Sequence, residues 1–331
     1  MLQGPVPAEG LISEALRRVE KALGARAKRS APLGARTTYR VGGSADLLVE
    51  ADQRDDLFEV AEALGGAEVP ILVVGVGSNL LIADGGFRGL AVVLGDGMAA
   101  LAIDTDRSSV TAGAALKLPL MARRAVAAGL TGLEWAVGVP GSVGGAVRMN
   151  AGGHGSDLAA SFSRAEVLSL VTGDVRSVGI ADMEFGYRSS SLDSTEVVLA
   201  ATFELEPGDR ALGEAELVDI VQWRRANQPG GQNAGSVFVN PPPEVSDRSS
   251  GELIDGLGLK GRRLGTASVS AKHANFIQAD EAGSADDVHR LIDEVAAEVC
   301  AETGVNLHTE IRMIGFGDGN EPTTPVSEAS Q

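Results

Sequence analysis

Residues 139–155 read VPGSVGGAVRMNAGGHG, and six of these seventeen residues are glycine, where average protein composition would supply about one. The stretch contains no lysine, and its one arginine and one histidine are separated from each other. A backbone with so few side chains lets another molecule approach closely and leaves amide groups to face an anion. We therefore interpret these residues as part of a ligand site in a globular chain.

A second glycine-rich stretch, VVGVGSNLLIADGGFRG at residues 73–89, follows a predicted strand. It is not a Walker loop, because it lacks the Gly-Lys-Ser/Thr ending. Nor is it the dinucleotide fingerprint, because a third glycine and a following helix are absent. Ordinary turns would explain either stretch alone. Two together, each with a serine beside its glycines, Ser78 and Ser142, can hold a pyrophosphate by backbone donors without a lysine.

The composition limits the kinds of partner that the chain can have. It has 331 residues, enough for two or three domains, and its hydrophobic content is 44%. The formal net charge of −17 argues against nucleic acid and anionic membranes as partners. The single cysteine, Cys300, excludes an internal disulfide and a cysteine-rich zinc site, and it suits a reducing cytoplasm. We expect neither a signal peptide nor a membrane-spanning segment.

Hydrophobic periodicity predicts alternating helices and strands early in the chain and clustered strands in the middle, which indicates the α+β class. Helices are predicted over residues 11–29, 54–64, 118–129, 213–227 and 284–303. Strands are predicted over residues 45–51, 69–75, 90–95, 101–104, 109–113, 195–205 and 309–316, with short strands around 236–239 and 266–278. A hairpin is predicted around the turn TGD, residues 172–174. We expect residues 1–14 and 317–331 to be disordered, because they are polar and aperiodic.

Eight segments, in order over roughly residues 15–316, carry a resemblance to a known family. They are TTYRVGGSADLLVE (37–50), VGVGSNLLIADGGFRG (74–89), GVPGSVGGAVRMNAGGHG (138–155), FGYRSSSL (185–192), NAGSVFVNPP (233–242), LIDGLGLKG (253–261), SVSAKHANFI (268–277) and HTEIRMIGF (308–316). The chain resembles the UDP-N-acetylenolpyruvoylglucosamine reductases, flavoenzymes that complete UDP-N-acetylmuramic acid for the bacterial cell wall. The spacing between FGYRSSSL and NAGSVF resembles the shorter subtype of the family, which lacks an inserted tyrosine loop.

The resemblance implies both a fold and a reaction. The fold is the FAD-binding fold of the vanillyl-alcohol-oxidase (PCMH) type, with FAD-binding lobes at residues 15–100 and 101–225 and a C-terminal substrate-binding domain at 226–316. In the reaction, NADPH reduces non-covalently bound FAD. The flavin then passes a hydride to UDP-N-acetylglucosamine enolpyruvate, which becomes UDP-N-acetylmuramate.

Three catalytic residues follow from motif positions in this resemblance. Arg188 of FGYRS is expected to stabilise the negative charge that develops on the substrate carboxylate, a task that suits a forked and permanently charged group. Ser236 of NAGSVF is expected to donate the proton to carbon, and Glu310 of HTEIRMI to be the acid partner beside the enolate. Each has a purely structural alternative: a surface charge for Arg188, a capping hydroxyl for Ser236 and an ion-paired strand carboxylate for Glu310.

The resemblance also implies two sets of binding residues. The residues expected to bind FAD are Arg40, Gly75, Gly77, Ser78, Asn79, Leu80, Gly141, Ser142, Gly144, Gly145, Asn150 and Gly152. The residues expected to contact substrate are Tyr187, Asn240, Lys260 and His273. No metal site is expected, because the remaining histidines are scattered.

The sequence departs from the family pattern at Arg36, His154, Gln278 and Asp280, which concerns individual contacts rather than the class. Two other functions stay open at this point: a flavin-dependent oxidase of the same fold, and a non-catalytic nucleotide-binding module. The absence of a fitting cysteine tether argues against the oxidase, and the presence of all three catalytic positions argues against the module. The oligomeric state is open, with a monomer favoured, and the location is expected to be cytoplasmic.

Overall fold

The computed structural model describes residues 9–317, with side chains from residue 14 onward. The chain divides into two compact units, each built from several segments. Unit 1 comprises Met1–Ala31, Ala45–Val76 and Arg88–Arg224, and unit 2 comprises Pro32–Ser44, Gly77–Phe87 and Arg225–Gln331. The disorder expected for residues 1–8 and 318–331 lies outside the described residues, whereas residues 9–14, which were also expected to be disordered, belong to a helix that begins at Glu9.

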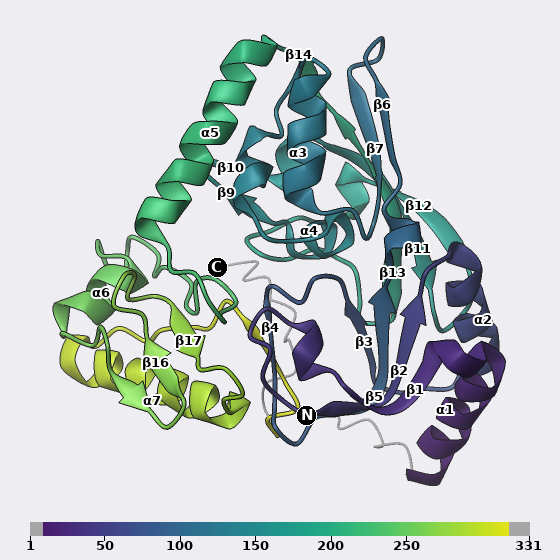
Figure 1. The fold of residues 1–331 in the computed structure, drawn as a ribbon, viewed down its shortest axis with the longest axis horizontal. Coiled ribbons are helices and arrows are strands. Elements are labelled where there is room, and N and C mark those ends of the chain that lie inside the picture. Colours follow the sequence, from purple (N-terminus) through teal and green to yellow (C-terminus); the bar gives the residue numbers. More distant parts are fainter. Residues whose placement is uncertain (1–8, 318–331) are drawn as a thin grey trace, which may run out of the picture. The chain divides into compact units, whose positions relative to one another are not determined.

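The first sheet of unit 1 has four strands in the order β1 (Ala27–Pro32), β2 (Ser44–Ala51), β5 (Phe87–Leu94) and β3 (Ile71–Val74). Strand β3 runs parallel to β5. Helices α1 (Glu9–Leu23) and α2 (Arg54–Leu64) cover one face of this sheet (Figure 1). Fully buried Leu47 and Val49 of β2 pack there with Leu57 and Val60 of α2, so an apolar face on each element forms the core.

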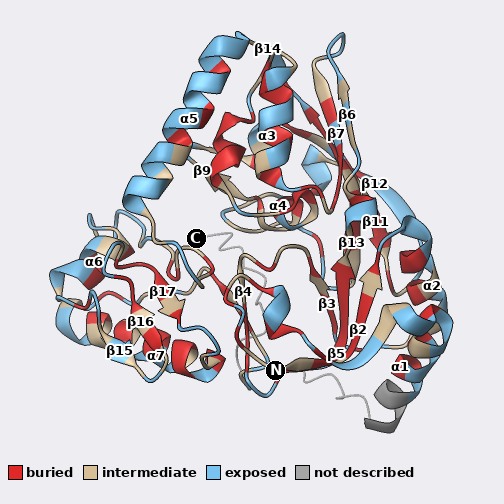
Figure 2. Cartoon of the chain, in the orientation of Figure 1, coloured by how far each residue is buried: buried red, intermediate tan, exposed pale blue. Residues whose placement is uncertain are grey.

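The second sheet of unit 1 is antiparallel. Its strands lie in the order β12 (Val175–Gly179), β11 (Phe162–Ser169), β13 (Glu196–Glu204), β7 (Ser109–Gly113) and β6 (Leu101–Asp104). The pairing of β11 with β12 confirms the predicted hairpin. Helices α3 (Leu118–Ala127), α4 (Val143–Met149) and α5 (Arg210–Asn227) contribute to the core beside this sheet, and their core-facing positions are buried in Figure 2.

The remaining elements of unit 1 are short. Strand β9 (Gly152–Gly153) pairs with β10 (Ser156–Asp157), and β8 (Leu130–Thr131) pairs with β14 (Glu206–Pro207). Short 3₁₀ helices occur in both units. They span Gly24–Arg26, Gly34–Arg36, Asp96–Met98, Glu134–Gly138, Leu158–Ala160 and Ile180–Asp182.

Unit 2 has a core of its own. Strands β15 (Arg263–Leu264), β16 (Ala267–Val269) and β17 (Ile277–Ala279) form an antiparallel sheet, and β4 (Leu80–Ile82) pairs in parallel with β18 (Arg312–Ile314). Helices α6 (Ser250–Gly256) and α7 (Ala285–Thr303) pack against this core. Buried Tyr39 joins it and donates its hydroxyl hydrogen to the Ile277 carbonyl at 3.0 Å, and burial raises the pKa of Tyr39.

Four predictions about elements need correction. The helix predicted over 11–29 begins at Glu9 and ends at Leu23, because Gly24 adopts a positive φ of 53° and β1 follows. Residues 236–239 form only an isolated bridge between Phe238 and Thr309 instead of a strand. The strand predicted over 309–316 is reduced to β18, and helices α4 and α6 were not predicted, whereas the short strands predicted around 266–278 are present as β16 and β17. The domain boundaries at 100 and 225 stay predictions. Among the described helices, none is long and apolar enough to cross a membrane.

Candidate active site

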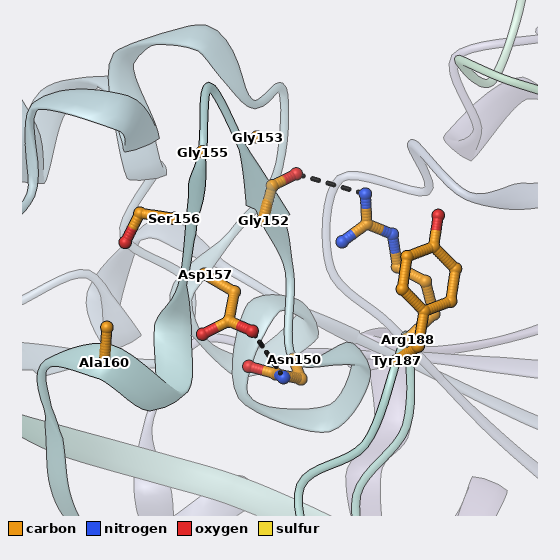
Figure 3. Close-up of a pocket in the computed structure, with 9 residues that line it drawn as sticks. All are labelled: Asn150, Gly152, Gly153, Gly155, Ser156, Asp157, Ala160, Tyr187 and Arg188. Atoms are coloured by element: carbon orange, nitrogen blue, oxygen red, sulfur yellow. Dashed lines mark hydrogen bonds between the residues drawn. The ribbon is translucent and has the colours of Figure 1, made fainter. Parts of the chain in front are cut away.

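A pocket of about 480 Å³ opens in unit 1 beside the end of helix α4 (Figure 3). One wall is the β9–β10 hairpin, and another is the turn that carries Tyr187 and Arg188. The lining residues are Asn150, Gly152, Gly153, Gly155, Ser156, Asp157, Ala160, Tyr187 and Arg188. Four of them are predicted site residues from two separate sequence motifs: Asn150 and Gly152 from the segment 138–155, and Tyr187 and Arg188 from the segment 185–192.

Arg188 occupies a strained position in a tight turn. The backbone of Gly186 exchanges hydrogen bonds with that of Ser189, at 3.2 and 3.4 Å, and Arg188 between them has a φ of 52°. Glycine and asparagine favour this conformation, which costs another residue about 1–2 kcal/mol. The guanidinium Nη2 of Arg188 donates to the Gly152 carbonyl at 3.1 Å, and its carbon lies 5.0 Å from the centre of the Tyr187 ring. Strained residues of this kind are enriched at active sites, which makes Arg188 a candidate functional residue.

The side chain of Asn150 connects three parts of the pocket. Its Nδ2 donates to Asp157 Oδ2 and to the Gly186 carbonyl, both at 3.1 Å, and its Oδ1 accepts from the Ala159 N–H at 3.0 Å. Asn150 is buried and has a φ of 38°, which asparagine tolerates better than most residues do. The amide therefore serves the protein itself, and contact between Asn150 and FAD stays a prediction.

The two glycine-rich stretches meet in unit 1. A Cβ atom at Gly75 would lie 2.2 Å from Oγ of buried Ser142, the residue that precedes helix α4. Gly144 also lies close to its surroundings, because a Cβ there would be 3.0 Å from that of Ala114. A Cβ at Gly145 would only make ordinary contact, 3.5 Å from Ser142 Oγ. The two glycine-rich stretches therefore approach each other, as expected if they hold one pyrophosphate together.

Two further glycines of the predicted FAD set serve the local fold. The Gly141 carbonyl accepts a hydrogen bond of 2.9 Å from the Leu118 N–H at the start of α3. Gly152 lies opposite Asp157 in the hairpin, where a Cβ would come within 2.7 Å of the Asp157 Cβ. The close approach explains the missing side chain at Gly152, and contact with FAD stays a prediction for both glycines.

The second half of the earlier glycine stretch belongs to unit 2. Gly77 has a φ of 62°, and a Cβ there would lie 2.7 Å from the Arg36 carbonyl oxygen. The N–H of Thr38 donates to the Gly77 carbonyl at 3.2 Å, while the buried Thr38 Oγ1 has no hydrogen-bond partner among the described atoms. A buried hydroxyl without a partner beside a narrow glycine turn fits a polar group of a bound molecule.

The other predicted FAD residues of unit 2 differ in burial and in hydrogen bonding. The side-chain amide of Asn79 donates to the Glu310 carbonyl at 3.3 Å, and the backbone carbonyl of Asn79 accepts from the Arg312 N–H at 2.9 Å. Asn79 therefore joins the start of β4 to the chain around the start of β18. Ser78 and Leu80 flank it and are half-buried, and Arg40 is exposed with a φ of 55°.

Ser236 and Glu310 are brought together by backbone pairing in unit 2. The Glu310 N–H donates to the carbonyl of Val237, the neighbour of Ser236, at 2.7 Å. Buried Asn275 holds the same segment, because its side chain both donates to and accepts from the backbone of Phe238, at 2.8 and 2.9 Å. Ser236 and Glu310 are both half-buried. Arg188 and Tyr187 belong to unit 1.

Two predicted substrate residues of unit 2 influence each other. Lys260 Nζ donates to Asp255 Oδ2 at 2.7 Å. Burial lowers the pKa of half-buried His273, the charge of Lys260 lowers it further, and Asp255 acts in the opposite direction. Asn240, the remaining member, is exposed and accepts from the Ser250 N–H at 3.1 Å, at the start of α6.

Two residues with site properties were not predicted. Thr38 lies inside a segment that carries the resemblance, where only the charged Arg40 was predicted to contact FAD. Asp157 follows the glycine-rich stretch 139–155 in the sequence and lies in the second strand of the hairpin. His154, a departure from the family pattern, packs edge-on against Trp223 with ring centres 5.0 Å apart. Within residues 9–317 no group of histidine, cysteine or acidic side chains could hold a metal.

Comparison with known proteins defines first the class and then the family. Residues 45–179 match the family described as FAD binding domain, and with the mixed α+β architecture this defines a flavoprotein of the FAD-binding, PCMH-type fold. Residues 226–314 match the family described as UDP-N-acetylenolpyruvoylglucosamine reductase, C-terminal domain. A reductase of that name from Synechococcus sp. (strain RCC307) is 41% identical over 291 residues, which cover 87% of this chain and 94% of the relative. The chain belongs to the UDP-N-acetylenolpyruvoylglucosamine reductase family.

Other relatives agree. The reductase of Heliobacterium modesticaldum is 41% identical over 290 residues, 87% of this chain and 90% of the relative. The crystal structure of the Thermus caldophilus reductase superposes with a TM-score of 0.74 at 32% identity, covering 87% of this chain and 99% of that one. The predicted family, fold class and enzyme class are confirmed: this is a flavin oxidoreductase of peptidoglycan precursor synthesis. Family membership also rules against the oxidase and the non-catalytic module.

Proposed function

We propose that the chain reduces UDP-N-acetylglucosamine enolpyruvate to UDP-N-acetylmuramate in the cytoplasm, with NADPH as electron donor and FAD bound without a covalent tether. The single observation that carries this proposal beyond family membership is the strained Arg188 turn, which directs a guanidinium onto the rim of a pocket. A cation there suits a substrate that carries a carboxylate on the reacting group.

The residues present fit FAD. Gly75 approaches Ser142 without intervening side chains, and the buried Thr38 hydroxyl lacks a partner among the described atoms. These features suit a pyrophosphate and other polar groups held by backbone donors in an acidic protein. When bound and reduced by NADPH, FAD supplies the hydride for the substrate. The single cysteine, Cys300, lies in helix α7, outside both glycine-rich stretches of the sequence.

The chain's own residues have three tasks in this proposal. As the enolpyruvyl methylene carbon gains hydride, negative charge develops on the neighbouring carbon and its carboxylate. Arg188 stabilises this charge by forking across the carboxylate oxygens. Ser236 gives its hydroxyl proton to that carbon, which completes the addition of hydride and proton across the double bond. Glu310 stands beside the developing enolate as the acid partner.

A two-step anaerobic assay tests the proposed function. The purified protein should be yellow, and NADPH should bleach it. Adding UDP-N-acetylglucosamine enolpyruvate should restore the colour and yield a product two mass units heavier than the substrate. Acid precipitation should leave the flavin in the supernatant. A colourless protein, or a reduced protein that reoxidises with oxygen but not with the substrate, would contradict the proposal.

A further inference from the structure

Asp157 lines the pocket but has no task in the proposed reaction. It is half-buried in strand β10, where its backbone pairs with Gly152 of β9. Its carboxylate is directed toward Asn150, and Oδ2 accepts the Asn150 Nδ2 hydrogen bond at 3.1 Å (Figure 3). A carboxylate that lines the same pocket as a cation that should bind an anionic group requires an explanation, because its charge opposes that anion.

The contacts of Asp157 lead to Arg188 by two short routes. Asn150, which Asp157 holds, donates from the same Nδ2 to the carbonyl of Gly186, the residue that opens the Arg188 turn. Gly152, which pairs with Asp157, supplies the carbonyl that accepts from Arg188 Nη2. The backbone before the arginine and the acceptor at its tip are therefore both fixed by residues that Asp157 contacts.

The orientation of the Asn150 amide depends on this arrangement. Its oxygen accepts from the Ala159 N–H, so the two N–H groups must face Asp157 and Gly186. Because Asn150 is buried, removing the Asp157 acceptor would leave a donor without a partner and favour a rearranged side chain. A rearranged amide would no longer hold the Gly186 carbonyl in place.

We propose that Asp157 is a positioning residue whose side chain sets the Arg188 turn, and with it the guanidinium, through Asn150. This proposal rests on the proposed role of Arg188. What matters in it is the hydrogen-bond acceptor of Asp157, not its charge. An asparagine at this position can still accept from Asn150, whereas an alanine cannot.

The experiment compares Asp157→Ala, Asp157→Asn, Arg188→Ala and the double variant Asp157→Ala/Arg188→Ala in the full chain. The control is Asp209→Ala, which removes a carboxylate that accepts backbone hydrogen bonds of 2.8 and 3.0 Å at the start of α5 in the same unit. Measured quantities are FAD content, melting temperature, the rate of bleaching by NADPH, and the rate of reoxidation by the enolpyruvyl substrate.

We expect Asp157→Ala to retain FAD and bleaching and to reoxidise at least about tenfold more slowly, whereas Asp157→Asn stays within about threefold of the wild type. The double variant should reoxidise no more slowly than Arg188→Ala, because both changes disable one guanidinium. Normal reoxidation of Asp157→Ala beside a slow Arg188→Ala would overturn the positioning role alone. Equal loss in Asp157→Asn and Asp157→Ala would also overturn it, in favour of a role for the charge. A fully active Arg188→Ala would overturn the role of Arg188 itself.

Discussion

The backbone N–H of Glu310 donates a hydrogen bond of 2.7 Å to the carbonyl oxygen of Val237. The neighbour of Ser236 is thereby tied to Glu310, although the two lie far apart in the sequence. Val239 continues the pairing by donating to the His308 carbonyl at 2.9 Å. The proposed proton donor and its acid partner therefore lie on two segments of unit 2 that are joined by backbone hydrogen bonds.

Substitutions at Gly75 and Ser142 test the contact between the two glycine-rich stretches. Gly75→Ala would put a Cβ 2.2 Å from Ser142 Oγ, so we expect a loss of about 1–3 kcal/mol in stability and weaker FAD retention. In a Ser142→Gly background the same change should cost less, because the opposing hydroxyl is gone. Thermal unfolding and flavin content measure both effects. Gly85→Ala is the control, since a Cβ at Gly85 has no heavy atom within 4 Å. An equal loss of stability on Gly75→Ala in the wild-type and Ser142→Gly backgrounds would contradict the contact.

Arg188 combines backbone strain with a proposed catalytic role, so stability and activity should separate. Arg188→Gly relieves the positive φ of 52°, and we expect stability to stay within about 1 kcal/mol of the wild type or to rise. Reoxidation by the substrate should nevertheless collapse in this variant. Arg188→Lys should also be slow, because a point charge cannot fork across two oxygens. Glu184→Gly, at a φ of 45° and exposed, should keep full activity as the matched control. Near-normal turnover by Arg188→Lys would show that the arginine is structural.

His273 should be uncharged at neutral pH. Burial and Lys260 lower its pKa, so the folded protein binds fewer protons there than the unfolded chain does between the lowered pKa and the ordinary value of about 6.5. Stability should therefore fall as the pH drops below about 6.5, and His273→Gln should reduce this fall. An NMR titration, with the signal assigned from the same variant, should give a midpoint below the ordinary value that rises in Lys260→Met. A wild-type midpoint at or above the ordinary value would contradict the burial argument.

The sequence was sufficient for the class and the family, because motifs such as FGYRSSSL and NAGSVF survive as contiguous segments. Helix α4 was not expected inside a glycine-rich stretch, since glycine has a low helix propensity. Its Val143 and Val147 are fully buried, and this tertiary packing outweighs the propensity. Helix α1 ends at Leu23 because the next residue, Gly24, adopts a left-handed conformation.

The surroundings of the site residues could not be predicted from the sequence. The resemblance supplied Arg188, Ser236 and Glu310 as positions, but their surroundings depend on contacts between distant segments. The Asn150–Gly186 hydrogen bond and the pairing of Glu310 with Val237 have no local sequence signal. Asp157 was missed for the same reason, because its contact with Asn150 appears only once the hairpin closes.

Ser236 is the proposed donor of the proton to the substrate carbon. The control variant is Ser246→Ala, which removes a serine of unit 2 whose hydroxyl donates to the Arg248 carbonyl at 3.2 Å. It should behave as the wild type in both half-reactions. Ser236→Cys should recover part of the activity lost in Ser236→Ala, because a thiol is a stronger acid than a hydroxyl.

The most direct measurement times the two half-reactions of Ser236→Ala separately in an anaerobic stopped-flow instrument. Bleaching by NADPH should proceed at the wild-type rate, because it requires no proton from Ser236. Reoxidation by UDP-N-acetylglucosamine enolpyruvate should be slower by about 10²–10⁴-fold, the usual contribution of a positioned proton donor. Reoxidation at the wild-type rate would contradict the account and assign the proton to another group.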